Sequence, residues 1–184
     1  DAYRLGEVRK DLEEVEPIVR NADIVSFDVG AIRQSDAPGN INATPNGFYG
    51  EEACKITRYA GLSDKLSSFG FYEINPSCDM RDQTSHLVAQ MLWYFIDGYY
   101  QRKKDVPMVN QNDYVKYRVN VLKDDADDNR NEIIFFKSKK SERWWMEVPT
   151  HVTRHAHHGP HLVPCSYQDY QMATKDEIPE RWWN

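Results

Sequence analysis

A short apolar segment that ends in an acidic residue most constrains the fold of this chain. The segment runs from Ala22 to Val29 and is rich in β-branched and aromatic residues, which is typical of a strand buried on both sides. Asp28 lies at its end, and a loop rich in glycine and proline follows. In open α/β sheets, ligands bind beyond the carboxyl ends of the strands, in loops of this kind. The segment therefore predicts a buried parallel strand with a candidate ligand site at its end.

Helical patterns surround this strand. An amphipathic pattern from Leu5 to Val15 predicts a first helix that ends between Pro17 and Asn21. A second helix is expected from Glu51 to Tyr59, with Gly61 as its C-terminal stop. The strand thus lies between two helices, as in a repeating helix–strand unit.

A second strand and a third helix continue the alternation. Leu66–Ile74 reads as another buried strand with Glu73 near its end, and Pro76 terminates it because proline cannot donate a ladder hydrogen bond. The apolar residues from Leu87 to Tyr99 recur at helical spacing. This order predicts right-handed crossovers and a parallel sheet covered on both faces. Two strands make a poor parallel sheet, so further strands are expected upstream or from a partner.

The character of the sequence changes from Asn110 onward. Tyr114–Val121 and Glu132–Lys137 flank an acidic turn and predict an antiparallel hairpin. The segment beyond Trp144 is expected to be loop-like and to pack against the α/β part, because its aromatic residues bury large areas. The expected organisation is therefore an α/β segment over residues 1–109 and a hairpin with an aromatic-rich tail over residues 110–184.

Composition excludes several classes of function. The net charge of −6, with acidic and basic residues intermixed, gives no broad basic field for nucleic acid. No apolar run approaches the roughly 20 residues that span a bilayer, and the chain starts without a signal-peptide pattern. Three widely separated cysteines suggest neither a disulfide framework nor a zinc site. We expect a soluble, cytoplasmic protein with no nucleic-acid or membrane partner, and a sequence that is part of a longer polypeptide.

Two motifs in tandem carry a resemblance to a known family. Their residues are Ser26-Phe27-Asp28, Ala37-Pro38-Gly39, Pro45 and Gly47-Phe48, followed by Glu73-Ile74-Asn75-Pro76, Asp79 and Thr84. In their order and spacing these motifs resemble the ureohydrolase family, which includes arginase, agmatinase and formimidoylglutamase. The resemblance covers residues 1–104 and implies the C-terminal part of a three-layer αβα sandwich around a parallel sheet.

The resemblance also implies a chemistry. Members of the family hold two manganese ions at the strand ends, and a bridging hydroxide attacks a guanidino or formimino carbon. Such a pair of cations, about 3.5–4 Å apart, needs several carboxylates to neutralise and bridge it. Asp28 matches the first carboxylate of the family's Asp-x-Asp metal pair. Glu73 matches the acidic residue that meets the cationic amidine group of the substrate, where a carboxylate suits a charge-assisted hydrogen bond.

This chain departs from the family pattern at the same strand end. Gly30 stands at the second carboxylate of the metal pair, and Arg33-Gln34 stands where the family usually has Asp-Pro. An arginine so near the strand end would oppose bound cations. The family's Gly-Gly-Asp-His and Asp-Ala-His-x-Asp segments do not occur in these residues. We therefore assign no catalytic residue, and do not expect this chain alone to hold two metals.

Several alternatives stay open at the sequence level. The protein is either a divergent hydrolase of linear amidine C–N bonds, completed by ligands from outside these residues, or a non-catalytic scaffold or binding protein. Asp28 is either a metal ligand or a cap for loop amides. Glu73 is either a polar site group or the partner of Arg33 or Arg81 in an ion pair.

Three further clusters are weighed in the same way. Five histidines between His151 and His161 could bind zinc, nickel or copper, or form an exposed loop. The acidic run Asp124–Asn129 departs from the EF-hand template and is expected to be a solvated turn. The pairs Trp144-Trp145 and Trp182-Trp183 are expected to anchor a core or an interface within a homo-oligomer.

Overall fold

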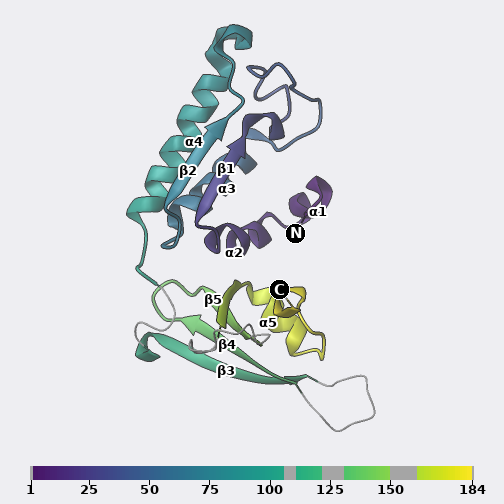
Figure 1. Cartoon of the computed structure of the whole chain (residues 1–184), viewed down its shortest axis with the longest axis vertical. Coiled ribbons are helices and arrows are strands. Elements are labelled where there is room, and N and C mark those ends of the chain that lie inside the picture. The colour runs from purple at the N-terminus through teal and green to yellow at the C-terminus, as the bar shows by residue number, and fades with distance from the viewer. Residues whose placement is uncertain (1, 106–110, 122–130, 150–160, 184) are drawn as a thin grey trace, which may run out of the picture. The chain divides into compact units, whose positions relative to one another are not determined.

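The computed structural model describes residues 2–105, 111–121, 131–149 and 161–183. The chain folds into two compact units, Asp1–Arg102 and Lys103–Asn184 (Figure 1). Each unit has a hydrophobic core of its own.

The first unit is built on a pair of parallel strands. Strands β1 (Ile24–Asp28) and β2 (Ser68–Tyr72) pair in parallel, and helix α3 (Gly50–Leu62) connects them. Helix α4 (Gln83–Tyr100) follows β2. The predicted α/β class and parallel sheet are confirmed. Four short 3-10 helices complete the unit: η1 (Leu12–Glu14), η2 (Val29–Ala31), η3 (Pro76–Cys78) and η4 (Met80–Asp82).

The expectation of one continuous first helix is wrong. The segment forms α1 (Leu5–Lys10) and α2 (Val15–Arg20), with η1 between them. The helix is interrupted at Asp11, whose backbone leaves the helical region of φ and ψ. The Asp11 carboxylate accepts the Glu13 N–H at 3.1 Å. Pro17 lies in the first turn of α2, where its missing N–H would have had no intrahelical partner. Proline is therefore tolerated in the first turn of this helix, which ends at Arg20, within the predicted range from Pro17 to Asn21.

Only one face of the two-stranded sheet is covered. Val25 pairs in register with Phe69 on this face, and Phe95 of α4 packs against Phe69 with ring centroids 5.2 Å apart. On the opposite face, Ile24 is 70% exposed and Tyr72 56% exposed. The prediction of strands buried on both sides is therefore wrong for the described residues, because α3 and α4 share a single core with the first face.

Gly61 has a different role from the predicted helix stop. It lies within α3, where a Cβ atom would come within 2.2 Å of the Phe95 carbonyl oxygen in α4. A Cβ on Gly98 of α4 would likewise lie 2.5 Å from the Arg58 oxygen. The two helices thus cross with their backbones in close approach, which only glycine permits at these positions.

Helix α4 confirms the predicted third helix, and its apolar stripe is partly buried. Met91 is fully buried, and Leu87 and Val88 pack on the core. Two other members of the apolar stripe, Leu92 and Tyr99, are 48% and 51% exposed. Within the described residues, the structure has no helix with the length and apolar character needed to cross a membrane.

The second unit is an antiparallel sheet. Strands β3 (Tyr114–Val121) and β4 (Asn131–Ser138) pair antiparallel, which confirms the predicted hairpin. The sheet continues in the order β3-β4-β5-β6 with β5 (Trp144–Val148) and β6 (His161–Cys165). Three short helices accompany it: η5 (Gln111–Asp113), α5 (Tyr167–Ala173) and η6 (Glu180–Trp183).

The expectation of a loop-like segment beyond Trp144 is wrong. A tight turn after β4, in which the Ser138 N–H donates to the Arg143 oxygen at 2.9 Å, brings the chain back along the sheet. Trp144, Met146 and Val148 are then buried in the core of this unit. Their burial gives β5 an apolar set strong enough to hold it in the sheet, despite the proline and histidine residues that follow.

Aromatic side chains dominate the second core. Trp144 stacks on Tyr170 with centroids 4.9 Å apart, and the ring of Phe135 meets Tyr170 edge-on at 5.5 Å. Trp144 is 8% exposed, which confirms its predicted role as a core anchor, whereas Trp183 is 59% exposed. The acidic run and His151, His155, His157 and His158 lie outside the described residues, and His161 is exposed at the start of β6.

Candidate functional site

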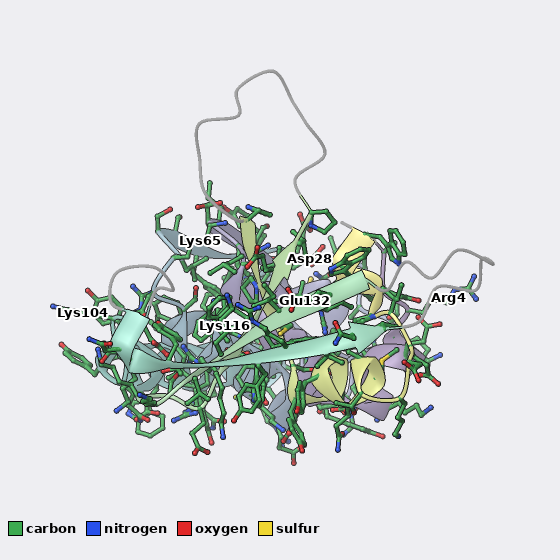
Figure 2. All side chains as sticks on the ribbon, turned by 90° about the horizontal axis from the view of Figure 1, so that it is seen from below. Arg4, Asp28, Lys65, Lys104, Lys116 and Glu132 are labelled. Atoms are coloured by element: carbon green, nitrogen blue, oxygen red, sulfur yellow. The ribbon has the colours of Figure 1, made fainter. Side chains whose placement is uncertain are left out.

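The two predicted site residues lie at adjacent strand ends. Asp28 is the last residue of β1 and pairs in register with Tyr72, the last residue of β2, so that Glu73 follows immediately. Both carboxylate-bearing residues are exposed, and Figure 2 shows Asp28 among the side chains of the whole chain. The carboxyl ends of parallel strands thus bring two residues from distant parts of the sequence to one edge of the sheet.

Asp28 caps the loop that follows its strand. Its Oδ1 atom accepts the backbone N–H of Gly30 at 2.7 Å and so starts η2. This is the contact expected if Asp28 caps loop amides. The other carboxylate oxygen has no hydrogen-bonding partner in the described part of the chain. The same side chain can therefore cap the loop and still offer one oxygen to a ligand.

A buried amide fills the space beside Gly30. A Cβ atom on Gly30 would lie 3.2 Å from Nδ2 of Asn40 and 3.0 Å from Oδ1 of Asp28. Asn40 is 5% exposed; its Nδ2 donates to the Glu73 oxygen at 2.9 Å, and its Oδ1 accepts the Asn42 N–H at 2.6 Å. A cation beside Gly30 would consequently meet a hydrogen-bond donor, where metal binding needs an acceptor.

Glu73 is held by its backbone, and the residue is exposed. Its φ angle of 63° lies in the left-handed region, which is uncommon for a residue other than glycine. Glu73 does not form the alternative ion pair with Arg33. Arg33 instead pairs with Asp36, with Nε 2.8 Å from Oδ1, and the Arg33 guanidinium stacks on the Tyr49 ring at 3.9 Å. The predicted contact of Glu73 with substrate stays a prediction.

The described residues do not fit a binuclear metal site. They contain no group of three or more histidine, cysteine or acidic side chains placed to hold an ion. Asp28 supplies one free oxygen, whereas two hard cations need several bridging and terminal oxygen ligands. Any manganese chemistry at this edge would therefore require ligands from beyond these residues, and no reaction step is assigned to it.

The loop beyond Asp28 is fastened to the start of α4 by a buried carboxylate. Asp79 accepts the N–H groups of Thr84 at 2.8 Å and Ser85 at 2.9 Å, and the Ser85 hydroxyl at 2.7 Å. Burial alone would raise the pKa of Asp79, but these hydrogen bonds outweigh it and lower the pKa to about 2. Thr84 Oγ1 in turn accepts the Gly39 N–H at 2.7 Å. These motif residues thus position the site loop.

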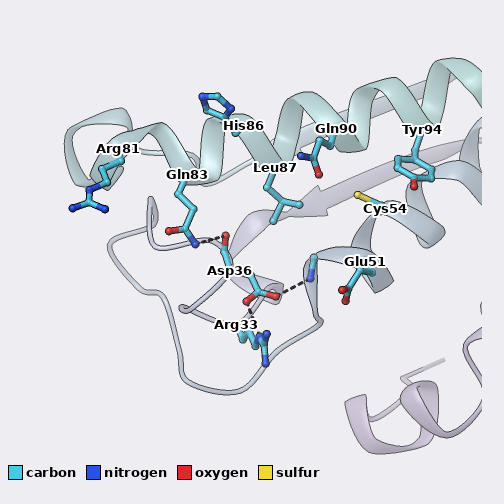
Figure 3. Close-up of a pocket in the computed structure, with 11 residues that line it drawn as sticks. Arg33, Asp36, Glu51, Cys54, Arg81, Gln83, His86, Leu87, Gln90 and Tyr94 are labelled. Carbon is cyan, nitrogen blue, oxygen red and sulfur yellow. Dashed lines mark hydrogen bonds and ion pairs between the residues drawn. The ribbon is translucent and has the colours of Figure 1, made fainter.

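Beside this loop lies a pocket that sequence reasoning missed (Figure 3). Its volume is about 750 Å³, and it opens between α3, α4 and the loop after β1. The one signal for it in the sequence is the spacing of His86, Gln90 and Tyr94, which places three polar side chains on one stripe of α4. We call it the α3–α4 pocket; its lining is Arg33, Asp36, Gly50, Glu51, Cys54, Arg81, Gln83, His86, Leu87, Gln90 and Tyr94.

Part of this lining is already neutralised. Asp36 accepts Arg33 Nε at Oδ1 and the Gly50 N–H at Oδ2, 2.9 Å away. Burial would raise the pKa of Asp36, but the hydrogen bonds from Gly50 and Arg33 lower it overall. Gln83 Nε2 donates to the Ser35 oxygen at 2.7 Å and ties α4 to the loop. Burial raises the pKa of the Cys54 thiol, so it stays protonated.

The fold and the strand-end carboxylates define an α/β protein of the arginase type. A model of the Arginase family matches residues 2–97, which is 96 of the 184 residues and just over half of the chain. The chain therefore belongs to the arginase family, as the tandem motifs predicted.

Relatives with a stated activity match just under half of the chain. Formimidoylglutamase from Bacillus subtilis (strain 168) is 28% identical over 90 residues, which cover 47% of this chain and 28% of that protein. The enzyme of the same name from Staphylococcus haemolyticus (strain JCSC1435) is 29% identical over 86 residues, covering 46% and 28%. The chain thus spans less than a third of the length of these relatives.

Solved structures agree with the sequence relatives. The crystal structure of formimidoylglutamase from Bacillus subtilis aligns with a TM-score of 0.50 and 25% identity, over 55% of this chain and 34% of that one. The structure of Trypanosoma cruzi formiminoglutamase with Mn²⁺ aligns with the same TM-score and identity, over 53% and 34%. The alignments confirm an arginase-type α/β fold over about half of this chain.

Proposed function

We propose that the protein hydrolyses the C–N bond of a linear amidine, with a formimino or guanidino compound as substrate. The observation that carries this proposal is the placement of Asp28 and Glu73 at adjacent parallel strand ends, in a chain of the arginase family. The formimidoylglutamase relatives favour a formimino substrate. Because the chain spans only part of those relatives, the activity belongs to the whole protein in this proposal.

Each of the two carboxylates has a distinct role in this function. Asp28 is the proposed metal ligand, since one oxygen is engaged by Gly30 and the other is open. Glu73 is the proposed contact for the cationic amidine, because an exposed carboxylate forms charge-assisted hydrogen bonds with amidinium N–H groups. Its backbone is tied to Asn40, which fixes where the side chain begins.

Manganese is the proposed metal. Its support is the family membership and the Trypanosoma cruzi relative solved with Mn²⁺. In enzymes with two metals, the ions generate a nucleophilic hydroxide and polarise the bond under attack. The described residues contribute Asp28 to such a site, and the remaining ligands would have to come from elsewhere.

The second candidate function is a non-catalytic scaffold or binding protein that has lost the binuclear site. Gly30 and its neighbour Asn40 favour this candidate, because a buried amide donor stands where the second carboxylate of the metal pair would project. Arg33 adds a positive charge nearby, although Asp36 neutralises much of it.

Metal content and turnover separate the two candidates. The protein at its natural length would be assayed for bound manganese and for release of formamide or urea from formiminoglutamate, agmatine and arginine. Two bound manganese ions with turnover would exclude the non-catalytic candidate. A metal-free, inactive protein that remains folded would exclude the hydrolase.

Substitution of Glu73 tests its proposed role. We expect Glu73→Gln to lower kcat/KM by about 10- to 100-fold, the cost of a hydrogen bond to a charged group, with bound manganese unchanged. The matched control is Glu142→Gln, since Glu142 is also an exposed glutamate with a left-handed backbone, φ 60°, but lies in the second unit. Equal activity of both variants would show that Glu73 does not contact the substrate.

A further inference from the structure

Helix α4 carries large apolar side chains that the core of the first unit does not bury. The helix runs along one side of that unit, beside β2 (Figure 1). Trp93 is 62% exposed, Ile96 43% and Tyr100 83%, and Leu92 and Tyr99 are each about half exposed. A helix that is apolar around most of its circumference is usually buried in a larger structure. These side chains therefore mark a face of α4 that is expected to be covered.

The exposed apolar residues of α4 repeat with a period of seven. The pairs seven residues apart are Ala89 and Ile96, Leu92 and Tyr99, and Trp93 and Tyr100, and all six residues are exposed. We call these six residues the outer stripe. Alternating steps of three and four residues, with a period of seven, form the seam along which one helix packs against another. The repeat therefore indicates that the partner of this face is a helix.

The outer stripe contains no charged residue, and the nearest charges in the sequence are engaged within the first unit. Asp97 pairs with Arg58 of α3, with Oδ2 3.0 Å from Nε. Arg102 donates to the Gly61 oxygen at 2.8 Å, and its guanidinium stacks on Tyr99 at 4.5 Å. A strongly charged partner would find no opposite charge on this stripe. An identical stripe, in contrast, can be buried against it without bringing like charges together.

The exposed area of the outer stripe is large enough for an interface between two copies. If a whole large side chain has an area of about 200 Å², the exposed fractions of the five large residues amount to roughly 600 Å². Two copies that face each other would then bury about 1,200 Å² in total, which lies at the lower end of the range for specific protein interfaces. The stripe can therefore supply most of such an interface by itself.

We propose that two copies of the protein associate through their outer stripes, with the two α4 helices antiparallel. In the seam of such a pair, Leu92 of each copy faces the partner's Ile96, and the small Ala89 faces the partner's Tyr99. Large side chains thus meet small ones, and the aliphatic residues form the centre. The antiparallel order places opposite ends of the two helix dipoles together and keeps the two basic segments 102–104 apart. The association does not depend on hydrolase activity.

Sedimentation equilibrium of the protein at its natural length tests the contact. We expect Ile96→Glu to have half the mass of the parent assembly, because the contact would then bury two unpaired carboxylates. The matched control is Ile41→Glu, since Ile41 is also exposed, at 75%, but lies in the loop after β1. A parent protein with the mass of a single chain would overturn the proposal and would mean that another part of the same chain covers the stripe. An Ile96→Glu variant with the parent mass would also overturn it.

A mixture of two variants tests the antiparallel order and separates association from folding. Leu92→Lys alone should also halve the mass. When it is mixed with Ile96→Glu, we expect the parent mass to return, because the introduced lysine and the introduced glutamate face each other in the antiparallel seam. In a parallel pair, each introduced charge would face an apolar residue instead. Recovery of the mass also shows that both variants are folded. If the mixture keeps the halved mass, the antiparallel contact is wrong.

Discussion

The two units differ in how their strands pair and in how far the faces of their sheets are buried. In the second unit, four strands pair with their neighbours along the sequence, and one core buries Phe135, Met146 and Trp144. In the first unit, two parallel strands share one covered face and leave Ile24 and Tyr72 exposed on the other. An antiparallel sheet tolerates one solvated face, whereas parallel sheets are usually covered on both. Among the described residues, the second unit therefore pairs each strand with its neighbour in the sequence, whereas the first leaves one face of its sheet exposed.

The largest expected effect tests whether the second core is autonomous. Phe135→Ala should destabilise the second unit by about 3–5 kcal/mol, because it removes a fully buried ring and leaves a cavity. Hydrogen exchange measured by mass spectrometry should show lost protection in β3–β6 and unchanged protection in α3 and α4. The control is Phe136→Ala, whose side chain is only partly buried. Loss of protection in both units would break the comparison, since it would mean that the cores unfold together.

The next effect tests the close helix crossing in the first unit. Gly61→Ala should destabilise that unit by about 2–3 kcal/mol, because the added Cβ would lie 2.2 Å from a backbone oxygen and force α3 from α4. This loss of stability is measured by urea unfolding, followed through hydrogen exchange in α3 and α4. Gly6→Ala is the matched control, since nothing lies within 4 Å of its added Cβ in α1 and alanine favours a helix. A neutral Gly61→Ala would show that the crossing can relax.

The smallest effect concerns the carboxylate that fastens the site loop. Because the folded pKa of Asp79, about 2, lies below the unfolded value of 3.8, its contribution is present above pH 3.8 and is lost as pH falls toward 2. The shift corresponds to about 2 kcal/mol at neutral pH. Asp79→Asn should therefore destabilise the first unit at pH 7 and differ little from the parent chain near pH 2.

Urea unfolding at several pH values measures this difference. Asp82→Asn is the control, because Asp82 is exposed in the same turn and its side chain caps no helix amide. A difference between Asp79→Asn and the parent chain that stays constant from pH 7 to pH 2 would show that the loop is held by packing instead of charge.

Local patterns predicted the elements, while long-range contacts decided how they are used. The hairpin and the long helix α4 were predictable because alternating and helical periodicities act within one segment. The additional strands β5 and β6 were not, since the proline and histidine residues after β5 give the whole segment a loop-like composition, and a short segment becomes a strand only when a paired neighbour supplies its hydrogen bonds. The role of Gly61 was missed for a similar reason, because its nearest atoms lie on another helix.

The features of the candidate site also separate into those that local sequence predicts and those that only the folded structure shows. The sequence by itself determined the family and the carboxylates at the two strand ends, because motif order and residue type are local properties. Only the tertiary structure decided that Asn40 fills the space beside Gly30, that Arg33 is neutralised by Asp36, and that the outer stripe of α4 is exposed. Arg33 and Asp36 are only three residues apart, but their pairing, like the place of Asn40 beside Gly30, depends on the conformation of the loop, which residue spacing along a sequence does not encode.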